Sequence, residues 1–319
     1  MNVLIFAAAL DYLIGDPKGW WHPVQGIGWA IAYVTRWAFY CCQTPLALRC
    51  AGVVLGSSII LGSGFVGWAL VAIAHYLHPL VGTATASILL ASCFAARSLR
   101  DAATEVLRPL ATGDLVNARS RLSQYVGRDT DRLTATDILR AVFETVTENA
   151  TDGVLAPLFY ALVGAMLPIG SVPLALAYKA ASTLDSMVGY KDAPYTDLGW
   201  FSAKTEDVLT WMPCRLTVLT IALLSRRPLH VWRLCRRDAP QDPSPNSGWS
   251  ECAYATALDV QVGGVNYYRG IAKPKPLLGD AVQPITADVI DRALQLTRWS
   301  VLLWLTVCAI VSTLERFEF

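Results

Sequence analysis

The sequence has few charged residues. Only 16% of its 319 residues are Asp, Glu, Lys or Arg, whereas soluble domains carry about 25%. Its mean hydropathy is +0.41, and 54% of the residues are hydrophobic. The net charge is +1, with no basic or acidic tail, so the sequence gives no indication of a nucleic-acid partner. This composition argues against a soluble domain and indicates a membrane protein.

The sequence also lacks the common cysteine and nucleotide motifs. Its eight cysteines form no C-x-x-C pair and have no histidine at zinc-ligand spacing, which indicates small buried side chains in a reducing compartment. Neither G-x-x-x-x-G-K-[ST] nor G-x-G-x-x-G occurs, so a bound nucleotide would need a less familiar site. The N-terminal run MNVLIFAAAL has no Lys or Arg ahead of it, so we expect no cleaved signal peptide.

Long uncharged segments predict membrane helices. Residues 50–74 and 80–96 carry no charge and are separated only by HYLHP, which predicts a transmembrane hairpin. Residues 299–314 form a shorter third candidate with tryptophans suited to an interface. We expect one membrane-embedded catalytic domain over residues 1–319. Its predicted class is an all-α integral membrane protein with a transmembrane hairpin and a C-terminal span.

Three further apolar segments are ambiguous. If the polar motifs share one side of the membrane, residues 24–42, which contain an arginine, should lie along the interface as an amphipathic helix. Residues 153–177 contain three prolines and should form a re-entrant helical pair. Residues 208–224 contain a proline and an arginine and should not span. We therefore expect interfacial and re-entrant helices around an active site at the membrane edge.

The stretch ETVTENATDG (residues 144–153) places Glu144, Glu148 and Asp152 four residues apart. A helix repeats every 3.6 residues, so this spacing puts the three carboxylates along one face. One interpretation is a solvated acidic face. The other is a bound Mg²⁺, because like charges at this spacing repel and oxygen-only ligands favour that ion. The three residues are candidate metal ligands and catalytic groups, and we discount the enclosed glycosylation sequon.

A second polar stretch, YKAASTLDSMVGYKD (residues 178–192), directly follows the uncharged run. Lysines and hydroxyls at the end of an apolar segment suit a phosphate or a polar headgroup. The alternative for Lys179 is that its side chain extends to the membrane interface. The candidates for phosphate binding are Lys179, Thr183, Ser186 and Lys191, and Asp185 is a candidate for acid–base work.

Two short turns supply further candidates for acid–base work and for substrate binding. DYLIGDPKGWWHP contains Asp16 and His22, and His22 is either a general base or a structural residue. YVGRDT contains Arg128, which is either a phosphate clamp or a local cap. The basic run RRPLHVWRLCRR (residues 226–237) is typical of a cytoplasmic membrane edge.

These pieces, in this order, resemble the CbiB/CobD family of adenosylcobinamide-phosphate synthases. The resemblance extends over residues 11–268 and is carried by long, unusual stretches. They are DYLIGDP, HPVQGIG, RSLRDAATEV, GDLVNARSRLSQYVGRDT, ETVTENATDGVLAPLFY, AYKAASTLDSMVGYKD, SPNSGW and GGVNYY. One stretch departs from the family pattern, since Glu206 and Thr210 stand where the family has Asp and Asn.

The resemblance implies an amide-forming ligase that joins adenosylcobyric acid to aminopropanol phosphate or a similar amino alcohol phosphate. It implies ATP and Mg²⁺ as cofactors and the corrinoid as substrate. ATP would activate the carboxylate, cations would hold the phosphates and a base would free the amine. Within the matching motifs, Asp129, Asn149 and Asn246 join the substrate-binding candidates.

The resemblance also implies a multi-pass protein of the bacterial inner membrane, with its active site on the cytoplasmic side. The expected partners are the lipid bilayer and other cobalamin-assembly enzymes or a second copy of the chain. A CDP-alcohol phosphotransferase is disfavoured because TDGVLAPL lacks the arginine of that motif. An AmpE-like signalling protein or a transporter would explain the Pro and Gly breaks but not the many charges at segment edges.

Overall fold

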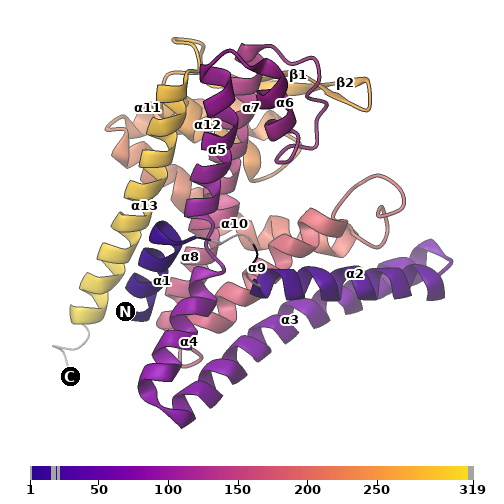
Figure 1. Cartoon of the computed structure of the whole chain (residues 1–319), viewed down its shortest axis with the longest axis vertical. Helices are drawn as coiled ribbons and strands as arrows, with labels where there is room; N and C mark the ends of the chain where they lie inside the picture. The colour runs from indigo at the N-terminus through magenta and orange to yellow at the C-terminus, as the bar shows by residue number, and fades with distance from the viewer. Residues whose placement is uncertain (1, 16–18, 20–21, 315–319) are drawn as a thin grey trace. The chain divides into compact units, whose positions relative to one another are not determined.

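The structure, a computed structural model, describes residues 2–15, 19 and 22–314 (Figure 1). It is 74% helical, which confirms the predicted all-α membrane class. The described residues also include a two-stranded antiparallel sheet that the sequence analysis did not anticipate. The chain folds as two compact units. Unit 1 comprises Met1–Arg97, Ala156–Thr210 and Trp304–Phe319, and unit 2 comprises Ser98–Leu155 and Trp211–Leu303.

Unit 1 is built from apolar helices whose starts are well defined by sequence. Each of α2, α3 and α4 has proline in its first turn, where the missing N–H costs nothing. The side chains of His22, Thr44 and His78 accept backbone N–H groups at the three starts. The helices within unit 1 are α1 (Asn2–Leu13), α2 (Pro23–Cys41), α3 (Pro45–Leu77), α4 (Pro79–Ala91), α8 (Ala156–Ala165) and α9 (Ser171–Val188).

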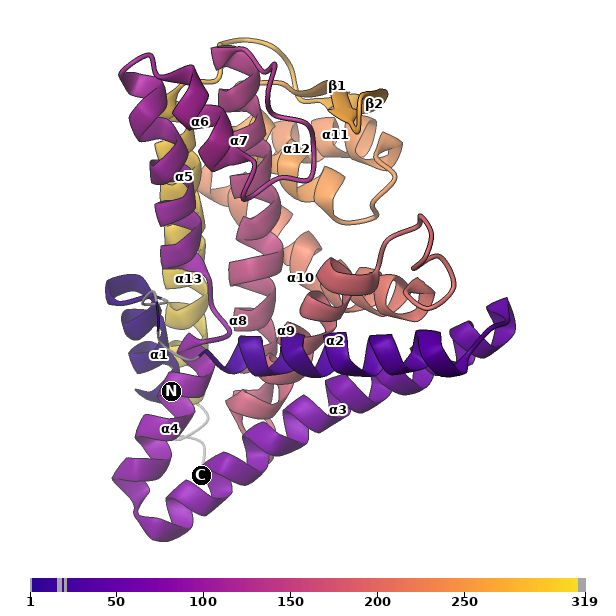
Figure 2. The same ribbon diagram turned by 45° about the vertical axis from the view of Figure 1, so that its right-hand side comes forward.

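Helix α3 packs closely on α9 and α2, and Figure 2 shows α2 and α3 closest near the turn that joins them. Small residues allow the approach, because a Cβ at Gly64 would lie 3.0 Å from the Pro173 carbonyl oxygen. A Cβ at Gly52 would lie only 2.1 Å from the Leu198 carbonyl oxygen. Ile31, Leu55, Leu184 and Val188 form an apolar core among these three helices. Unit 1 is therefore held by apolar contact and by backbone proximity.

Residues 153–177 contain two helices that pack against each other, as the helical-pair prediction requires. Helix α8 ends at Ala165 and α9 begins at Ser171. Gly170, with φ +81°, supports the turn, and a Cβ at Gly164 would lie 2.5 Å from the Gly170 carbonyl oxygen. The re-entrant placement of this pair in a bilayer stays a prediction.

In the described part of the chain, four helical segments are long and apolar enough to cross a membrane. Three contain the predicted spans and the fourth is α10, which is continuous and long and apolar enough to span. The preceding residues lengthen that helix to 25, and Pro213 removes only one donor from it. The expectation that residues 208–224 do not span stays a prediction. Helix α2 forms as predicted, and its interfacial position stays a prediction. The four segments are Pro45–Leu77, Pro79–Ala111, Trp200–Leu224 and Ala287–Leu314.

Unit 2 surrounds helix α12, which contacts α7, α11 and both strands (Figures 1 and 2). Mostly polar segments of mixed charge form its shorter helices. Helices α5, α10 and α13 each continue from one unit into the other along the chain. The elements are α5 (Ala96–Ala111), α6 (Leu115–Leu122), α7 (Ala135–Asn149), η1 (Ala150–Leu155), α10 (Trp200–Leu224), α11 (Pro228–Asp238), η2 (Ala239–Gln241), α12 (Ser247–Ala257), β1 (Val262–Tyr268), β2 (Ile271–Leu278) and α13 (Ala287–Leu314).

Candidate functional site

The acidic face of α7 is buried in unit 2. Glu144 is 1% exposed, and its Oε1 accepts a hydrogen bond of 2.9 Å from the backbone N–H of Gly263. Its Oε2 accepts one of 2.5 Å from Nη2 of Arg128, whose side chain is 9% exposed. A buried carboxylate needs such partners because desolvation opposes its charge. The interpretation of a solvated acidic face is therefore wrong for Glu144.

The YVGRDT turn is bound to the β1–β2 hairpin. Arg128 Nη1 donates to Asn266 Oδ1 at 2.9 Å, and the backbone N–H of Asp129 donates to the Tyr267 carbonyl at 2.7 Å. The Asp129 carboxylate accepts from the backbone N–H groups of Arg269 (3.0 Å) and Gly270 (2.7 Å). The structure thus joins two motifs of the sequence, VGRDT and GGVNYY, and gives both predicted phosphate-binding residues structural partners.

The paired glycines of GGVNYY explain the shape of β1. Gly263 and Gly264 have φ values of +95° and +103°, which side-chain-bearing residues rarely adopt, and the strand register shifts between Val262 and Gly264. A Cβ at Gly263 would lie 2.0 Å from the Pro276 carbonyl oxygen. The Gly263 carbonyl accepts a hydrogen bond from Arg140 Nη1. This bulge aims the Gly263 N–H at Glu144.

A second buried ion pair lies near the Arg128–Glu144 pair, and the sequence alone did not predict it. Lys275 Nζ on β2 contacts both carboxylate oxygens of Glu251 on α12, at 2.7 and 2.8 Å. Glu251 is 0% exposed. Burial lowers the pKa of Lys275, but the carboxylates of Glu251 and Glu144 outweigh that effect and raise it. The available signal was the alternation of lysine and proline in KPKP, next to GGVNYY.

Glu148 differs from its neighbours in having no direct partner. Its carboxyl makes no hydrogen bond or ion pair within the described part of the chain, and the residue is half-buried. Burial raises the pKa of Glu148; Lys275 opposes the shift, whereas Asp242 and Glu144 add to it. Burial also raises the pKa of Glu251.

The charges of this group do not balance. Three carboxyls, those of Glu144, Glu148 and Glu251, face the cations of Arg128 and Lys275. The group is therefore expected to retain a proton above the ordinary carboxyl pKa. We call these five residues the carboxyl cluster.

Asp152 does not follow the periodicity that placed it with Glu144 and Glu148. From Ala150 to Leu155 the chain forms a π-helix, which has more residues per turn than an α-helix. Ser250 on α12 donates to the Thr147 carbonyl at 2.6 Å, and its hydroxyl lies 2.7 Å from that of Thr151. The predicted single face thus ends at Asn149, whose amide donates to the Thr145 carbonyl.

The three carboxylates predicted to bind a metal ion do not form a ready-made coordination site in the described residues. Among the described residues, no group of three or more His, Cys, Asp or Glu side chains is placed to hold a metal ion. The two cations of the carboxyl cluster relieve the charge repulsion from which that site was inferred. Mg²⁺ carried on substrate phosphates needs only one or two protein carboxylates. Ligation by Glu144, Glu148 and Asp152 together therefore lacks support, whereas a single carboxylate contact from Glu148 or Asp152 stays a prediction.

Arg215 on α10 packs between two tryptophan rings, next to the residues that begin α12. The Arg215 guanidinium lies 4.6 Å from the ring centre of Trp249 and 5.1 Å from that of Trp211. Its Nη1 donates to Oδ1 of Asn246 at 3.1 Å. Asn246, a predicted substrate residue, thus has a fixed cation beside it. The resemblance covered Arg215 without assigning it a role.

The remaining predicted residues belong to unit 1. His22 Nδ1 accepts the Val24 N–H at 3.3 Å, so it caps α2. The hydroxyls of Thr183 and Ser186 donate to carbonyls of their own helix. Catalytic and substrate roles for these residues stay predictions. Lys179 is half-buried, Asp185 is half-buried and Lys191 is exposed. Asp16 lies outside the described residues.

Comparison with known proteins identifies the family. A sequence profile described as CobD/Cbib protein matches residues 4–297. The chain is 52% identical to the cobalamin biosynthesis protein CobD of Synechocystis sp. over 306 residues, which cover 94% of this chain and 90% of that protein. It is 43% identical over 304 residues to CobD of Halalkalibacterium halodurans, covering 94% and 92%.

The cobalamin biosynthesis protein CbiB of Salmonella typhimurium is 42% identical over 302 residues, which cover 93% of each chain. No solved structure gives a significant match. The sequence resemblance and these comparisons agree over nearly the whole chain, including the motifs that build the carboxyl cluster. The chain therefore belongs to the CobD/CbiB family of cobalamin biosynthesis proteins.

Proposed function

We propose that this chain forms an amide bond between a carboxylate of adenosylcobyric acid and the amine of aminopropanol phosphate or a similar amino alcohol phosphate. Membership of a cobalamin biosynthesis family supports this reaction. The structural observation that carries the proposal is Glu148, a carboxyl without a direct partner beside two buried ion pairs.

The amine needs a base. At neutral pH it is an ammonium, which has no lone pair for attack on a carbonyl carbon. A carboxylate of the cluster would attract that ammonium, as the carboxylate of Glu251 attracts the ammonium of Lys275. Glu148, with its raised pKa, is a better proton acceptor near neutrality than an ordinary carboxylate. In this proposal, one oxygen of Glu148 takes a proton from the substrate ammonium, which frees the nitrogen lone pair for attack on the activated carboxyl carbon. The phosphate then leaves as the amide forms, and the second proton of the nitrogen passes to solvent.

The carboxylate needs activation. When bound, ATP would supply a phosphate leaving group for the substrate carboxylate, and Mg²⁺ would screen its charge. The donor chemistry of unit 2 fits such groups in two places. Arg215 and Asn246 present N–H donors for phosphate, and Glu148 or Asp152 offers an oxygen for the metal. Arg128 would act through Glu144 and position the cluster.

The setting is also part of the proposal. Four helices that are long and apolar enough to cross a membrane indicate a multi-pass membrane protein. We place it in the bacterial inner membrane with the carboxyl cluster accessible from the cytoplasm, where ATP is available. Lipids surround it, and other cobalamin-assembly enzymes or a second copy of the chain are further proposed partners.

The proposal is tested with purified protein in lipid nanodiscs. With adenosylcobyric acid, aminopropanol phosphate, ATP and Mg²⁺, the wild type should yield the amide, detected by mass spectrometry. Glu148→Gln keeps the shape of the side chain but cannot accept a proton, so kcat should fall about 10²–10⁴-fold. The melting temperature should not fall, since Glu148 has no hydrogen bond to lose and its buried charge opposes folding.

Glu105→Gln is the matched control in the same unit. Glu105 accepts a hydrogen bond from the Tyr125 hydroxyl at 2.8 Å, which glutamine can also accept. This variant should keep wild-type turnover. Full activity of Glu148→Gln would overturn the assignment of the base. Absence of any amide product from stable wild-type protein would overturn the ligase and favour a signalling or transport role.

A further inference from the structure

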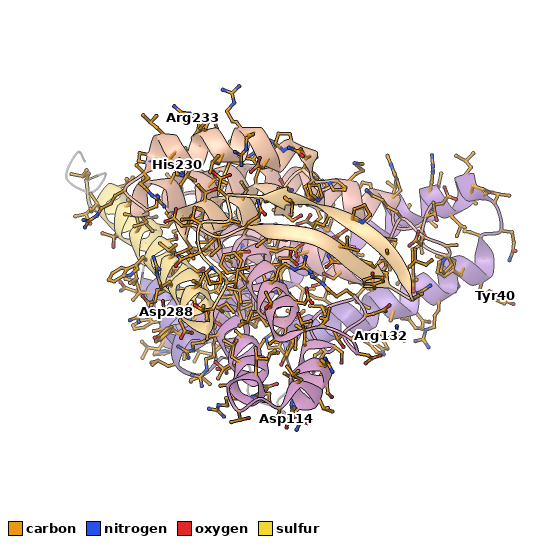
Figure 3. The ribbon with its side chains drawn as sticks, turned by 90° about the horizontal axis from the view of Figure 1, so that it is seen from above. Tyr40, Asp114, Arg132, His230, Arg233 and Asp288 are labelled. Atoms are coloured by element: carbon orange, nitrogen blue, oxygen red, sulfur yellow. The ribbon has the colours of Figure 1, made fainter. Side chains whose placement is uncertain are left out.

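Helix α11 has two distinct faces. Val231, Leu234, Cys235 and Asp238 are buried, whereas Leu229, Trp232, Arg233 and Arg236 are exposed. Each set follows the spacing i, i+3, i+4, i+7 and therefore occupies one side of the helix. Leu229 is 79% exposed and Trp232 is 38% exposed. Figure 3 shows Arg233 at the outer edge of α11, pointing away from the ribbon.

The arginines of the run RRPLHVWRLCRR fall into two classes. Arg227 donates to Asp259 at 3.0 Å, and Arg237 binds both Asp238 and Asp280. Arg226, Arg233 and Arg236 have no hydrogen bond or ion pair with any described residue. The first class holds α11 in the fold. The second class presents three unneutralised positive charges around Leu229 and Trp232.

The helix that precedes α11 also exposes apolar side chains near its end. Leu219 and Leu223, one turn apart near the end of α10, are 47% and 63% exposed. Helix α10 is long and apolar enough to cross a membrane, and only Ser225, Arg226 and Arg227 separate it from α11. A span whose exposed leucines lead into tryptophan and arginine matches the change from hydrocarbon to anionic headgroups.

We propose that α11 is an interfacial helix that binds anionic phospholipid through Arg226, Arg233 and Arg236. The three guanidinium groups contact the lipid phosphates, while Leu229 and Trp232 enter the boundary between headgroups and acyl chains. Charge complementarity favours this partner, since each arginine near an anionic surface adds about fivefold to affinity. The site is separate from the carboxyl cluster and does not depend on the proposed reaction.

The test uses the full chain in a neutral detergent, titrated with phosphatidylglycerol or phosphatidylcholine and observed by native mass spectrometry. The wild type should bind phosphatidylglycerol in preference to phosphatidylcholine, and added KCl should reduce that preference. The variant with Arg226, Arg233 and Arg236 all changed to Gln should bind phosphatidylglycerol about a hundredfold more weakly, from roughly fivefold for each arginine.

A variant with Arg121, Arg132 and Arg269 all changed to Gln is the matched control. It removes the same charge from exposed positions of unit 2 outside α11 and should keep the wild-type preference. An equal loss in both variants would show a general effect of charge and overturn the proposal. Displacement of the lipid by millimolar inorganic phosphate would also overturn it, because the site would then bind a soluble anion. The proposal would also be overturned if the α11 variant kept the wild-type preference for phosphatidylglycerol over phosphatidylcholine.

Discussion

Two ion pairs, one from each unit, differ sharply in burial. In unit 1 the Arg49–Asp197 ion pair lies at the surface, with the Arg49 side chain 55% exposed. In unit 2 the Arg128–Glu144 pair has side chains 9% and 1% exposed. An exposed pair contributes little to stability, whereas loss of one partner from a buried pair leaves an uncompensated charge. Removing the arginine should therefore change the free energy of unfolding far more in the buried pair than in the exposed pair.

The largest predicted effect tests this difference directly. Arg128→Met should destabilise the protein by about 3–5 kcal/mol, because Glu144 would keep its burial and lose its cation. Arg49→Met should cost at most about 1 kcal/mol. Both are measured by equilibrium unfolding of the purified protein. Adding Glu144→Leu to Arg128→Met should recover part of the loss, and equal effects of the two single variants would break the comparison.

A middle-sized effect tests what holds unit 1. Gly52→Ala should cost about 1–3 kcal/mol, because its Cβ would meet the Leu198 carbonyl oxygen, a backbone atom that cannot turn away. Gly62→Ala, on the same helix α3, meets nothing within 4 Å and should be neutral or stabilising by up to about 1 kcal/mol. Melting temperatures in one detergent give both values. An equal change at both positions would show that the close approach of the Leu198 carbonyl oxygen does not limit the side chain at residue 52.

The smallest predicted effect concerns pH. Because burial raises the folded-state pKa of Glu148, the folded protein holds a proton that the unfolded chain releases above its ordinary pKa near 4.5. Stability should therefore fall as pH rises from about 4.5 through that raised pKa, by at most about 1.4 kcal/mol per pH unit for one proton. Glu148→Gln should flatten this slope in thermal melts, and Glu105→Gln should leave it unchanged. A steeper slope in Glu148→Gln would reverse the assigned direction.

Much of the fold could be predicted from the sequence where the signal was local. Long uncharged runs predicted α3 and α4 of unit 1. Helix α10 continues through Pro213 and Arg215, and the Arg215 guanidinium packs on the ring of Trp249, a tertiary contact that spacing along the chain does not predict. The β1–β2 hairpin was missed because two glycines in β1 and two prolines in β2 hide the alternation of a strand.

The candidate site could be predicted from the sequence only where its residues are close together along the chain. Periodicity along α7 placed Glu144 and Glu148 on one face, and that placement holds up to the π-helix at Ala150. The identity of the compensating charges depended on tertiary contact. Arg128 reaches Glu144 from the preceding loop, and Lys275 reaches Glu251 from the hairpin. Neither pairing follows from spacing along the chain.

The hairpin that covers α7 has a consequence for synthesis. Glu144 is translated 119 residues before Gly263, and Arg128 is translated 138 residues before Asn266. At roughly 5–20 residues per second, the emerging chain keeps this face uncovered for about 6–24 seconds. During that interval the early half of unit 2 carries carboxylates intended for a closed environment. The final fold of this unit is therefore completed only when its last strand has left the ribosome.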